Sequence, residues 1–238
     1  MSGRQADLIL TNARVLTGDP TRPQASAVAV GGNRIVWVGH SDGLGGFPDT
    51  GARIVDCQGK TLVPGLIDAH IHLFAYAANL LGVECSPRAV RSIVEIQEAL
   101  ERRAAPEPPG SWIRGWGYNE FYLAEGRHPD RRDLDRAAPH HPVRLTHRSG
   151  HASVLSSLAM ERLDIGPQTP EPTGGIMERD PATGEPTGFF LEMEQALSSL
   201  GAPTLPEAEM ERGLEMACQR LLSLGVTSVH EATPSNAL

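Results

Sequence analysis

The sequence predicts an α/β protein that begins with a small all-β unit. Short apolar strands separated by glycine-rich turns fill the first sixty residues. After Pro64 and Gly65, strands alternate with capped helices, an order that builds a parallel sheet from β/α units. The polar pair His70 and His72 ends one of these strands and indicates a site at the carboxyl edge of that sheet.

The β unit is predicted to cover residues 1–63. Its central hairpin turns at Gly31-Gly32-Asn33, because glycine and asparagine tolerate the positive φ angles that such turns require. Hydrophobic residues alternate along the strand that follows this turn, as expected for a strand with one packed face. The four predicted strands cover residues 7–17, 25–30, 34–38 and 53–57.

The α/β part is predicted to cover residues 64–238. Ser92 with Glu95 forms a capping box for a helix through about Arg103, and Thr204 with Glu207 forms a second one for a helix that ends at Gly225. Glycine and proline are dense in an inserted region at about residues 163–203, which is predicted to contain a surface hairpin. Further strands are predicted at residues 112–118, 143–146 and 226–230, the last of them buried.

Alternation along the histidine strand places Asp68, His70 and His72 on one face. Residues two apart on a strand are separated by roughly 6.6 Å. Two imidazole side chains can close this span onto one cation at roughly 2.0–2.1 Å from each nitrogen. The pattern therefore predicts a divalent metal site; the alternative is a pair of solvent-facing or hydrogen-bonded histidines in a polar strand.

Composition excludes several classes of function. The net charge of −8 and a pI near 5.6 give no electrostatic footprint for nucleic acid or an anionic membrane. No apolar run reaches the roughly 20 residues that span a bilayer, and the first residues lack the apolar core of a signal peptide, so we expect a cytoplasmic protein. The three cysteines lie far apart and suggest neither a disulfide framework nor a zinc finger.

The histidine strand and several later segments together resemble the metal-dependent amidohydrolases. The resemblance is to amidohydrolase family 3, the branch that includes N-substituted formamide deformylases and YtcJ-like proteins. It extends over nearly the whole chain. The segments that carry it are residues 64–72, 112–117, 127–129, 133–135, 142–143, 150–152, 184–188 and 225–230.

This resemblance implies part of a (β/α)8 TIM-type barrel with an amino-terminal β-sandwich, and one or two divalent metal ions, with Zn²⁺ expected first. It implies that His70 and His72 bind metal, with Asp68 either holding an imidazole in its correct tautomer or capping local backbone. His151 matches a family position near the substrate, where it would stabilise charge on a carbonyl oxygen; the alternative is an ordinary surface histidine. The implied reaction is hydrolysis of a non-peptide carbon–nitrogen bond of the amide or formamide type.

Other polar and aromatic positions have two interpretations. Trp112, Trp116 and Tyr118 line an apolar pocket or fill the core, and Glu192 and Glu194 face the site or begin a solvated helix. At two further positions the residues depart from the family pattern, and we expect them in variable pocket walls. These positions are Ser156, where asparagine is usual, and Glu231, where aspartate is usual. Among the other histidines, His147 and His230 are weaker candidates, and His40, His128, His140 and His141 are expected in loops without a role.

Members of this family are considerably longer than 238 residues, and we expect the remaining metal ligands beyond Leu238. The sequence is therefore interpreted as a fragment. The expected partners are a small amide-type substrate and either a second copy or a complementary carboxyl-terminal half, with no nucleic acid and no membrane. The alternative function is a catalytically inactive remnant that serves as an interaction or assembly module.

Overall fold

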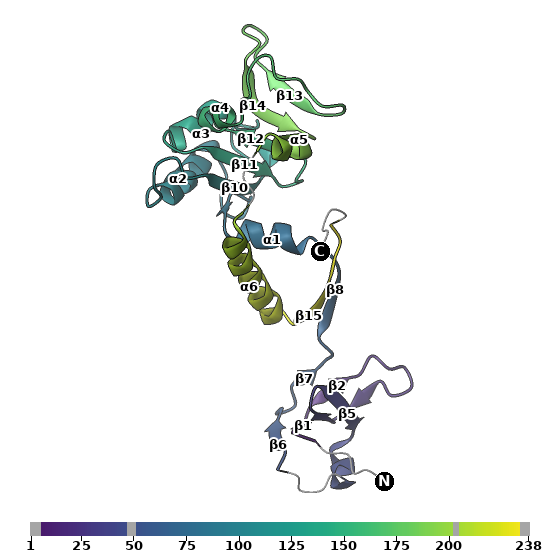
Figure 1. The fold of residues 1–238 in the computed structure, drawn as a ribbon. Coiled ribbons are helices and arrows are strands. Elements are labelled where there is room, and N and C mark those ends of the chain that lie inside the picture. Colours follow the sequence, from purple (N-terminus) through teal and green to yellow (C-terminus); the bar gives the residue numbers. More distant parts are fainter. Residues whose placement is uncertain (1–5, 47–50, 202–204, 234–238) are drawn as a thin grey trace. The chain divides into compact units, whose positions relative to one another are not determined.

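The protein is described by a computed structural model that covers residues 6–46, 51–201 and 205–233. The chain divides into two compact units, Met1–Ala69 with Gly225–His230 and His70–Leu224 with Glu231–Leu238 (Figure 1). The first unit contains strands and a short 3₁₀ helix, and the second contains both helices and strands. The predicted α/β class is therefore confirmed.

Two small sheets form most of the first unit. In the larger sheet the strand order is β5-β4-β1-β6, and β1 runs antiparallel to β4 and parallel to β6. In the smaller sheet the order is β3-β2-β7. The elements are β1 (Leu8–Thr11), β2 (Arg14–Leu16), β3 (Gln24–Ala25), β4 (Ala27–Gly31), β5 (Arg34–Gly39), the 3₁₀ helix η1 (Ser41–Gly46), β6 (Arg53–Asp56) and β7 (Thr61–Leu62).

The predicted hairpin is confirmed, because β4 and β5 pair antiparallel around the glycine turn. The predicted strand over residues 7–17 is interrupted at Asn12, which has a φ of 51°. Asparagine tolerates this left-handed conformation better than other side chains. The Asn12 Nδ2 donates a hydrogen bond to Asp56 Oδ1 at 3.0 Å. The chain therefore leaves β1 at this residue and continues as β2 in the other sheet.

β8 (Leu66–Ile71) and β15 (Val226–Glu231) form a two-stranded sheet. The Leu66 N–H donates to the Gly225 carbonyl at 2.8 Å, and the Ala232 N–H donates to the Ile71 carbonyl at 2.9 Å. We expected β15 to be buried, and this is wrong: it is half-buried at three positions and exposed at the other three. The reason is that β8 is the only strand paired with β15 in the part of the chain that the structure describes.

A six-stranded sheet is the centre of the second unit, with the order β13-β14-β12-β11-β10-β9. β9, β10 and β11 run parallel, and the remaining pairs are antiparallel. Ile113, Val143 and Leu145 are at most 1% exposed and share one apolar core with helices α2 and α3. The elements are β9 (Val83–Glu84), α2 (Ile93–Ala104), β10 (Ile113–Tyr118), the 3₁₀ helix η2 (Glu120–Tyr122), α3 (Arg131–Ala137), β11 (Val143–His147), β12 (Ala152–Leu155), α4 (Ser157–Arg162), β13 (Ile176–Arg179), β14 (Pro186–Leu191) and α5 (Glu194–Ser199).

Helices α1 (Leu73–Leu80) and α6 (Glu207–Ser223) pack against each other in the second unit. A Cβ atom at Gly213 would lie 2.8 Å from the Ala77 carbonyl oxygen, so this glycine permits the close approach. The helix predicted from the capping box at Thr204 is present, but Thr204 lies outside the described residues and α6 has Pro206 as its N-cap. In the described part of the chain, we find no helix with the length and apolar character needed to cross a membrane.

The described strands belong to four separate sheets, and none of these sheets closes on itself. Strands and helices nevertheless alternate in part of the second unit, as predicted. Ser92 caps α2 as predicted, by accepting a hydrogen bond from the Glu95 N–H at 3.1 Å. The hairpin predicted in the inserted region is present as β13 and β14. The TIM-type barrel itself stays a prediction.

Two of the segments that carry the family resemblance, residues 127–129 and 133–135, fix the beginning of α3. Asp130 and Asp133 form a capping box, in which the buried Asp133 carboxylate accepts from the Asp130 N–H at 3.0 Å. The same carboxylate accepts from Arg127 Nη1 at 2.7 Å. Burial raises the pKa of Asp133, but the hydrogen bonds from Arg127 and Asp130 together lower this pKa below its ordinary value. Residues 127–133 therefore carry a structural function.

We predict that Asp133→Asn lowers the free energy of unfolding by about 1–3 kcal/mol at pH 7, because it weakens a buried charge-assisted network. A lowered folded-state pKa stabilises the protein above the ordinary aspartate pKa, and this stabilisation is lost as the pH falls through the lowered pKa. The difference between the two proteins should therefore shrink between pH 7 and about pH 3. Urea unfolding at both pH values measures it.

The control for this prediction is Glu98→Gln, which removes a surface ion pair with Arg102. We expect it to change the free energy of unfolding by less than about 0.5 kcal/mol. A destabilisation by Asp133→Asn that is the same at both pH values would contradict the assignment.

Candidate functional site

The two predicted metal ligands lie together at the end of β8. His70 is the last but one residue of this strand, and His72 is the N-cap residue of α1. Their ring centroids are 5.4 Å apart, and the ring planes are nearly perpendicular at 83°. Both residues are exposed. The structure therefore brings both imidazoles to one place on the surface of the second unit.

Hydrogen bonds assign the proton on His72. The Thr233 hydroxyl donates to Glu231 Oε1 at 2.5 Å, so its oxygen is available as an acceptor. This oxygen lies 3.0 Å from His72 Nδ1 and accepts the hydrogen bond from that nitrogen. In a neutral imidazole the other nitrogen then has no proton. The neutral form of His72 therefore presents a lone pair on Nε2, which is the form that binds a metal ion.

Glu231 organises this end of β15. Its carboxylate accepts hydrogen bonds from the backbone N–H groups of Leu73, at 2.6 Å, and Thr233, at 2.9 Å. The hydrogen bond from the Thr233 side chain, followed by these backbone bonds, lowers the pKa of Glu231. We did not predict Glu231 or Thr233 beside His72, because Thr233 is 161 residues away from His72 along the chain and Glu231 lies close to Thr233.

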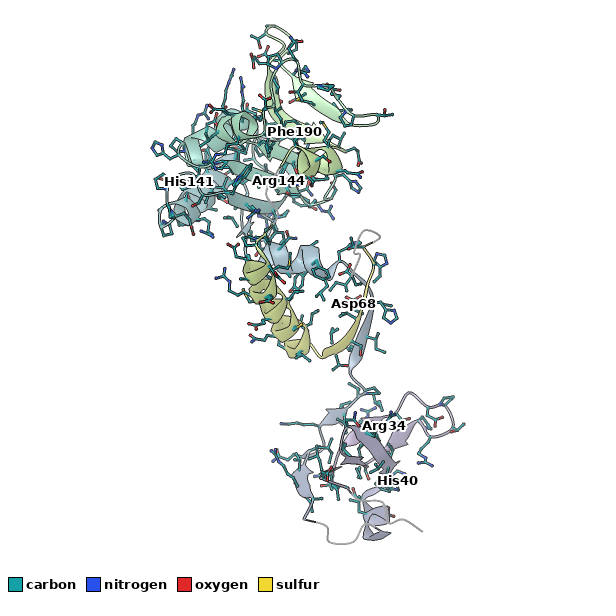
Figure 2. All side chains as sticks on the ribbon, in the orientation of Figure 1. Arg34, His40, Asp68, His141, Arg144 and Phe190 are labelled. Carbon is teal, nitrogen blue, oxygen red and sulfur yellow. The ribbon has the colours of Figure 1, made fainter. Side chains whose placement is uncertain are left out.

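A divalent metal ion requires more protein ligands than this pair supplies. Within residues 6–46, 51–201 and 205–233, we find no group of three His, Cys, Asp or Glu side chains that is able to hold a metal ion. The unprotonated Nε2 and the short separation of the two rings fit part of a metal-ligand set. Asp68 lies two residues before His70 on β8 and is half-buried (Figure 2).

His151 lies at a different part of the second unit, directly before β12. Its side chain is 64% exposed, and its Nδ1 is 3.1 Å from Glu192 Oε1. Because β12 runs antiparallel to β11, the beginning of β12 lies at the same sheet edge as the carboxyl end of β11. Glu194, in contrast, begins α5 and accepts hydrogen bonds from Arg144 and Ser153. Glu192 is therefore the acidic residue that accompanies His151.

A cluster of polar rings, which sequence analysis did not predict, lies at this sheet edge. Tyr118 ends β10, and its hydroxyl is 3.0 Å from His128 Nδ1. His147 ends β11, and its Nε2 is 3.0 Å from Glu120 Oε2. Burial lowers the pKa of His147, and Glu120 opposes this effect. His128 comes from a connecting loop, so no periodicity in the sequence places it beside β10 and β11.

The three aromatic residues of the β10 region do not share one face. Tyr118 is fully buried in the core with α2 and α3, whereas Trp116 is half-buried on the opposite face. Gly117 has a φ of 87°, and the pairing register between β10 and β11 shifts at this position. The shift breaks the alternation between Trp116 and Tyr118. Trp112, before the strand, packs against a second apolar core.

The position of Ser156 is also structural. Its hydroxyl caps α4 by accepting from the Ala159 N–H at 3.2 Å, and it accepts from the Val143 N–H at 2.9 Å. The side chain is 1% exposed. It therefore does not form part of an open pocket wall, as sequence analysis expected, because both of its hydrogen bonds hold α4 against β11.

The chain matches a family model and a known enzyme. Residues 53–237 match the model of the amidohydrolase family. The chain is 38% identical over 229 residues to N-substituted formamide deformylase from Arthrobacter pascens, covering 95% of this chain and 42% of that protein. The chain thus spans about two fifths of the length of this relative.

Two solved structures have a similar fold. An uncharacterized metal-dependent hydrolase from Pyrococcus horikoshii matches with a TM-score of 0.66 and 24% identity, covering 93% of this chain and 42% of that one. A second, from Pyrococcus furiosus, matches with a TM-score of 0.62 and 27% identity, covering 93% and 43%. Because the family model matches well over half of its residues, this chain belongs to the amidohydrolase family.

Proposed function

We propose that the protein acts as a metal-dependent hydrolase on non-peptide carbon–nitrogen bonds of amide or formamide type. The observation that supports this most strongly is the pair His70 and His72, with Nε2 of His72 left unprotonated by the Thr233 hydrogen bond. Membership of the amidohydrolase family and the similarity to N-substituted formamide deformylase support the reaction type. The proposed partner is a small amide-type molecule.

In this proposal His70 and His72 bind a divalent metal ion, with Zn²⁺ as the first candidate. When bound, such an ion lowers the pKa of a water molecule and polarises a substrate carbonyl. Thr233 and Glu231 hold the His72 ring in its orientation. Asp68 is the proposed positioning residue on β8. His151, with Glu192 at its Nδ1, is the proposed hydrogen-bond donor to the substrate carbonyl oxygen.

The alternative is an assembly module without catalysis, which the exposed apolar side chains of β8 favour. Leu66 is 54% and Ile67 is 64% exposed. Consecutive strand residues point to opposite faces, so each face of β8 presents an exposed apolar side chain, which favours contact with another chain segment. Here a second copy or a complementary carboxyl-terminal half would be the partner. The activity assay below separates the two functions.

The test of the function is hydrolysis of N-substituted formamides and short N-acyl amines by a zinc-loaded protein that also supplies the remaining metal ligands, with release of primary amine as the readout. We expect amine release that depends on added Zn²⁺ and that is lost in a variant with both His70→Ala and His72→Ala. A protein that binds zinc and forms a stable assembly but releases no amine from any substrate would favour the assembly function.

Metal uptake tests the ligand assignment without catalysis. We predict that, in a protein that also supplies the remaining metal ligands, the double variant His70→Ala with His72→Ala retains no stoichiometric zinc after reconstitution and desalting, because both proposed ligands are removed. Elemental analysis of the protein measures the metal content. The matched control is His40→Ala with His140→Ala, two exposed histidines outside the site. Stoichiometric zinc in the first variant would refute the assignment.

Removing the hydroxyl that accepts from His72 Nδ1 tests whether Thr233 supports this metal ligand. We predict that Thr233→Val weakens zinc binding by about 10–100-fold, because the ring loses the acceptor that fixes its tautomer and orientation. Competition with a chelator of known affinity measures this change. Thr227→Val, on β15, is the control and should leave the zinc affinity unchanged. Equal affinities in all three proteins would show that Thr233 does not act through His72.

A further inference from the structure

A cavity of about 380 Å³ in the second unit is separate from the candidate metal ligands. Apolar residues of α1 and α6, among them Phe74 and Met210, form one wall. The face of β10 and β11 opposite the apolar core forms the other, with Arg114, Trp116 and Arg144. This volume lies within the range of small-molecule binding sites, and an apolar wall with a few polar groups is typical of them.

Two N–H donors on residues that line this cavity have no acceptor in the described part of the chain. Trp116 Nε1 and Arg144 Nε are buried, and neither has a hydrogen-bond partner within the described part of the chain. A buried donor without a partner costs free energy, and such groups are rare in folded proteins. Both residues line the same cavity from neighbouring strands. A ligand with two acceptor atoms would satisfy both donors.

The charges around the cavity favour a singly charged anion. Arg114 and Arg144 are register neighbours on β10 and β11, and burial together with the charge of Arg114 lowers the pKa of Arg144. The two arginines thus lie close enough to repel each other. The Glu194 carboxylate contacts Arg144 but is also hydrogen-bonded to Ser153, and it leaves Arg144 Nε without an acceptor.

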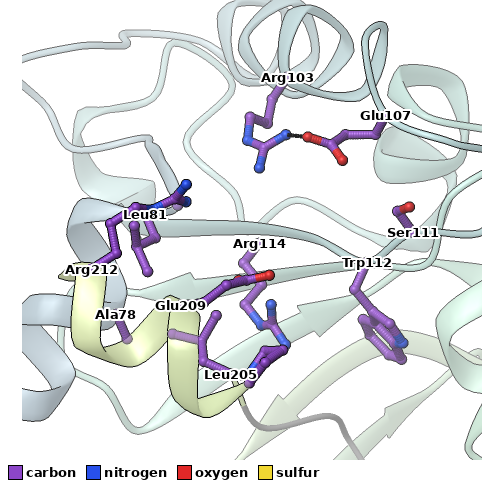
Figure 3. A pocket seen from close by; sticks show the side chains of 12 residues that line it. Ala78, Leu81, Arg103, Glu107, Ser111, Trp112, Arg114, Leu205, Glu209 and Arg212 are labelled. Carbon is purple, nitrogen blue, oxygen red and sulfur yellow. Dashed lines mark hydrogen bonds and ion pairs between the residues drawn. The ribbon is translucent and has the colours of Figure 1, made fainter.

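Glu209 lines the adjacent cavity, which Arg114 borders as well (Figure 3). Burial lowers the pKa of Arg114, and the negative charge of Glu209 opposes this effect. With Glu194 and Glu209 nearby, a dianion such as phosphate would meet repulsion. A carboxylate has a single charge and two strong acceptor oxygens, which matches the two open donors.

We propose that this cavity binds a small monocarboxylate with a short apolar body, whose oxygens accept hydrogen bonds from Trp116 and Arg144. The apolar body would contact Phe74 and Met210, which face the same space. This site requires neither metal nor catalysis, so it is independent of the proposed hydrolase function.

The test uses the indole N–H signals of ¹⁵N-labelled protein. The sequence contains three tryptophans, so single Trp→Phe variants assign each signal. Benzoate and hexanoate are titrated at constant ionic strength against chloride, with benzamide and hexanamide as neutral analogues. We expect the Trp116 signal to move saturably with the carboxylates, while the signals of Trp37 and Trp112 stay in place. No movement, or equal movement with the amides, would overturn the proposal.

Variants test the two donors separately. Trp116→Phe retains an aromatic ring and removes the indole N–H, so we expect benzoate affinity to fall about tenfold, measured by calorimetry. Trp112→Phe is the matched control, because this residue lines the adjacent cavity and not this one, and it should bind benzoate as the unchanged protein does.

Arg144→Lys retains the charge beside Glu194 but removes Nε, and it should weaken benzoate binding as well. An unchanged affinity in Trp116→Phe, or tighter binding of inorganic phosphate than of benzoate, would contradict the proposed site. Trp116→Phe removes one polar atom together with part of the indole, and its folding is checked by the amide spectrum. The proposal therefore stays testable even if Arg144→Lys does not fold.

Discussion

The hydrogen bonds among Glu231, Thr233 and His72 are the interaction on which the proposed chemistry depends. They join the end of β15 to the beginning of α1, because Glu231 accepts from the Leu73 N–H while Thr233 accepts from His72 Nδ1. The same bonds decide which nitrogen of His72 carries the proton. The same hydrogen bonds therefore join two chain segments and orient a proposed metal ligand.

The second unit presents two further sets of polar groups on its sheet. At the carboxyl edge of β10 and β11 lie the Tyr118, Glu120, His128 and His147 cluster and the His151–Glu192 pair. On the face opposite the apolar core lie the arginine pair and the unpartnered donors of the cavity. Parallel strands bring their carboxyl ends to one edge, which is why residues from separate loops meet there. The sheet thus separates a polar edge from an amphipathic cavity.

Local signals in the sequence were sufficient wherever a few neighbouring residues decide the structure. Ser92 begins α2, the glycine turn after β4 makes a hairpin, and the inserted region forms β13 and β14. Prediction failed where the structure depends on a single backbone angle or on a residue that is distant in the sequence. The positive φ of Gly117 changes the face of Tyr118, and that of Asn12 ends β1. Thr233 reaches His72 across 161 positions, which no spacing rule detects.

The most direct test of the central claim is a long-range ¹H–¹⁵N spectrum of the histidine side chains during titration with zinc. We predict that, in a protein that also supplies the remaining metal ligands, a ring nitrogen of His70 and Nε2 of His72 change shift with one equivalent of zinc, while His72 Nδ1 keeps its proton. Unchanged signals of His70 and His72 in a protein that has bound zinc would contradict the account, because the metal would then be held elsewhere.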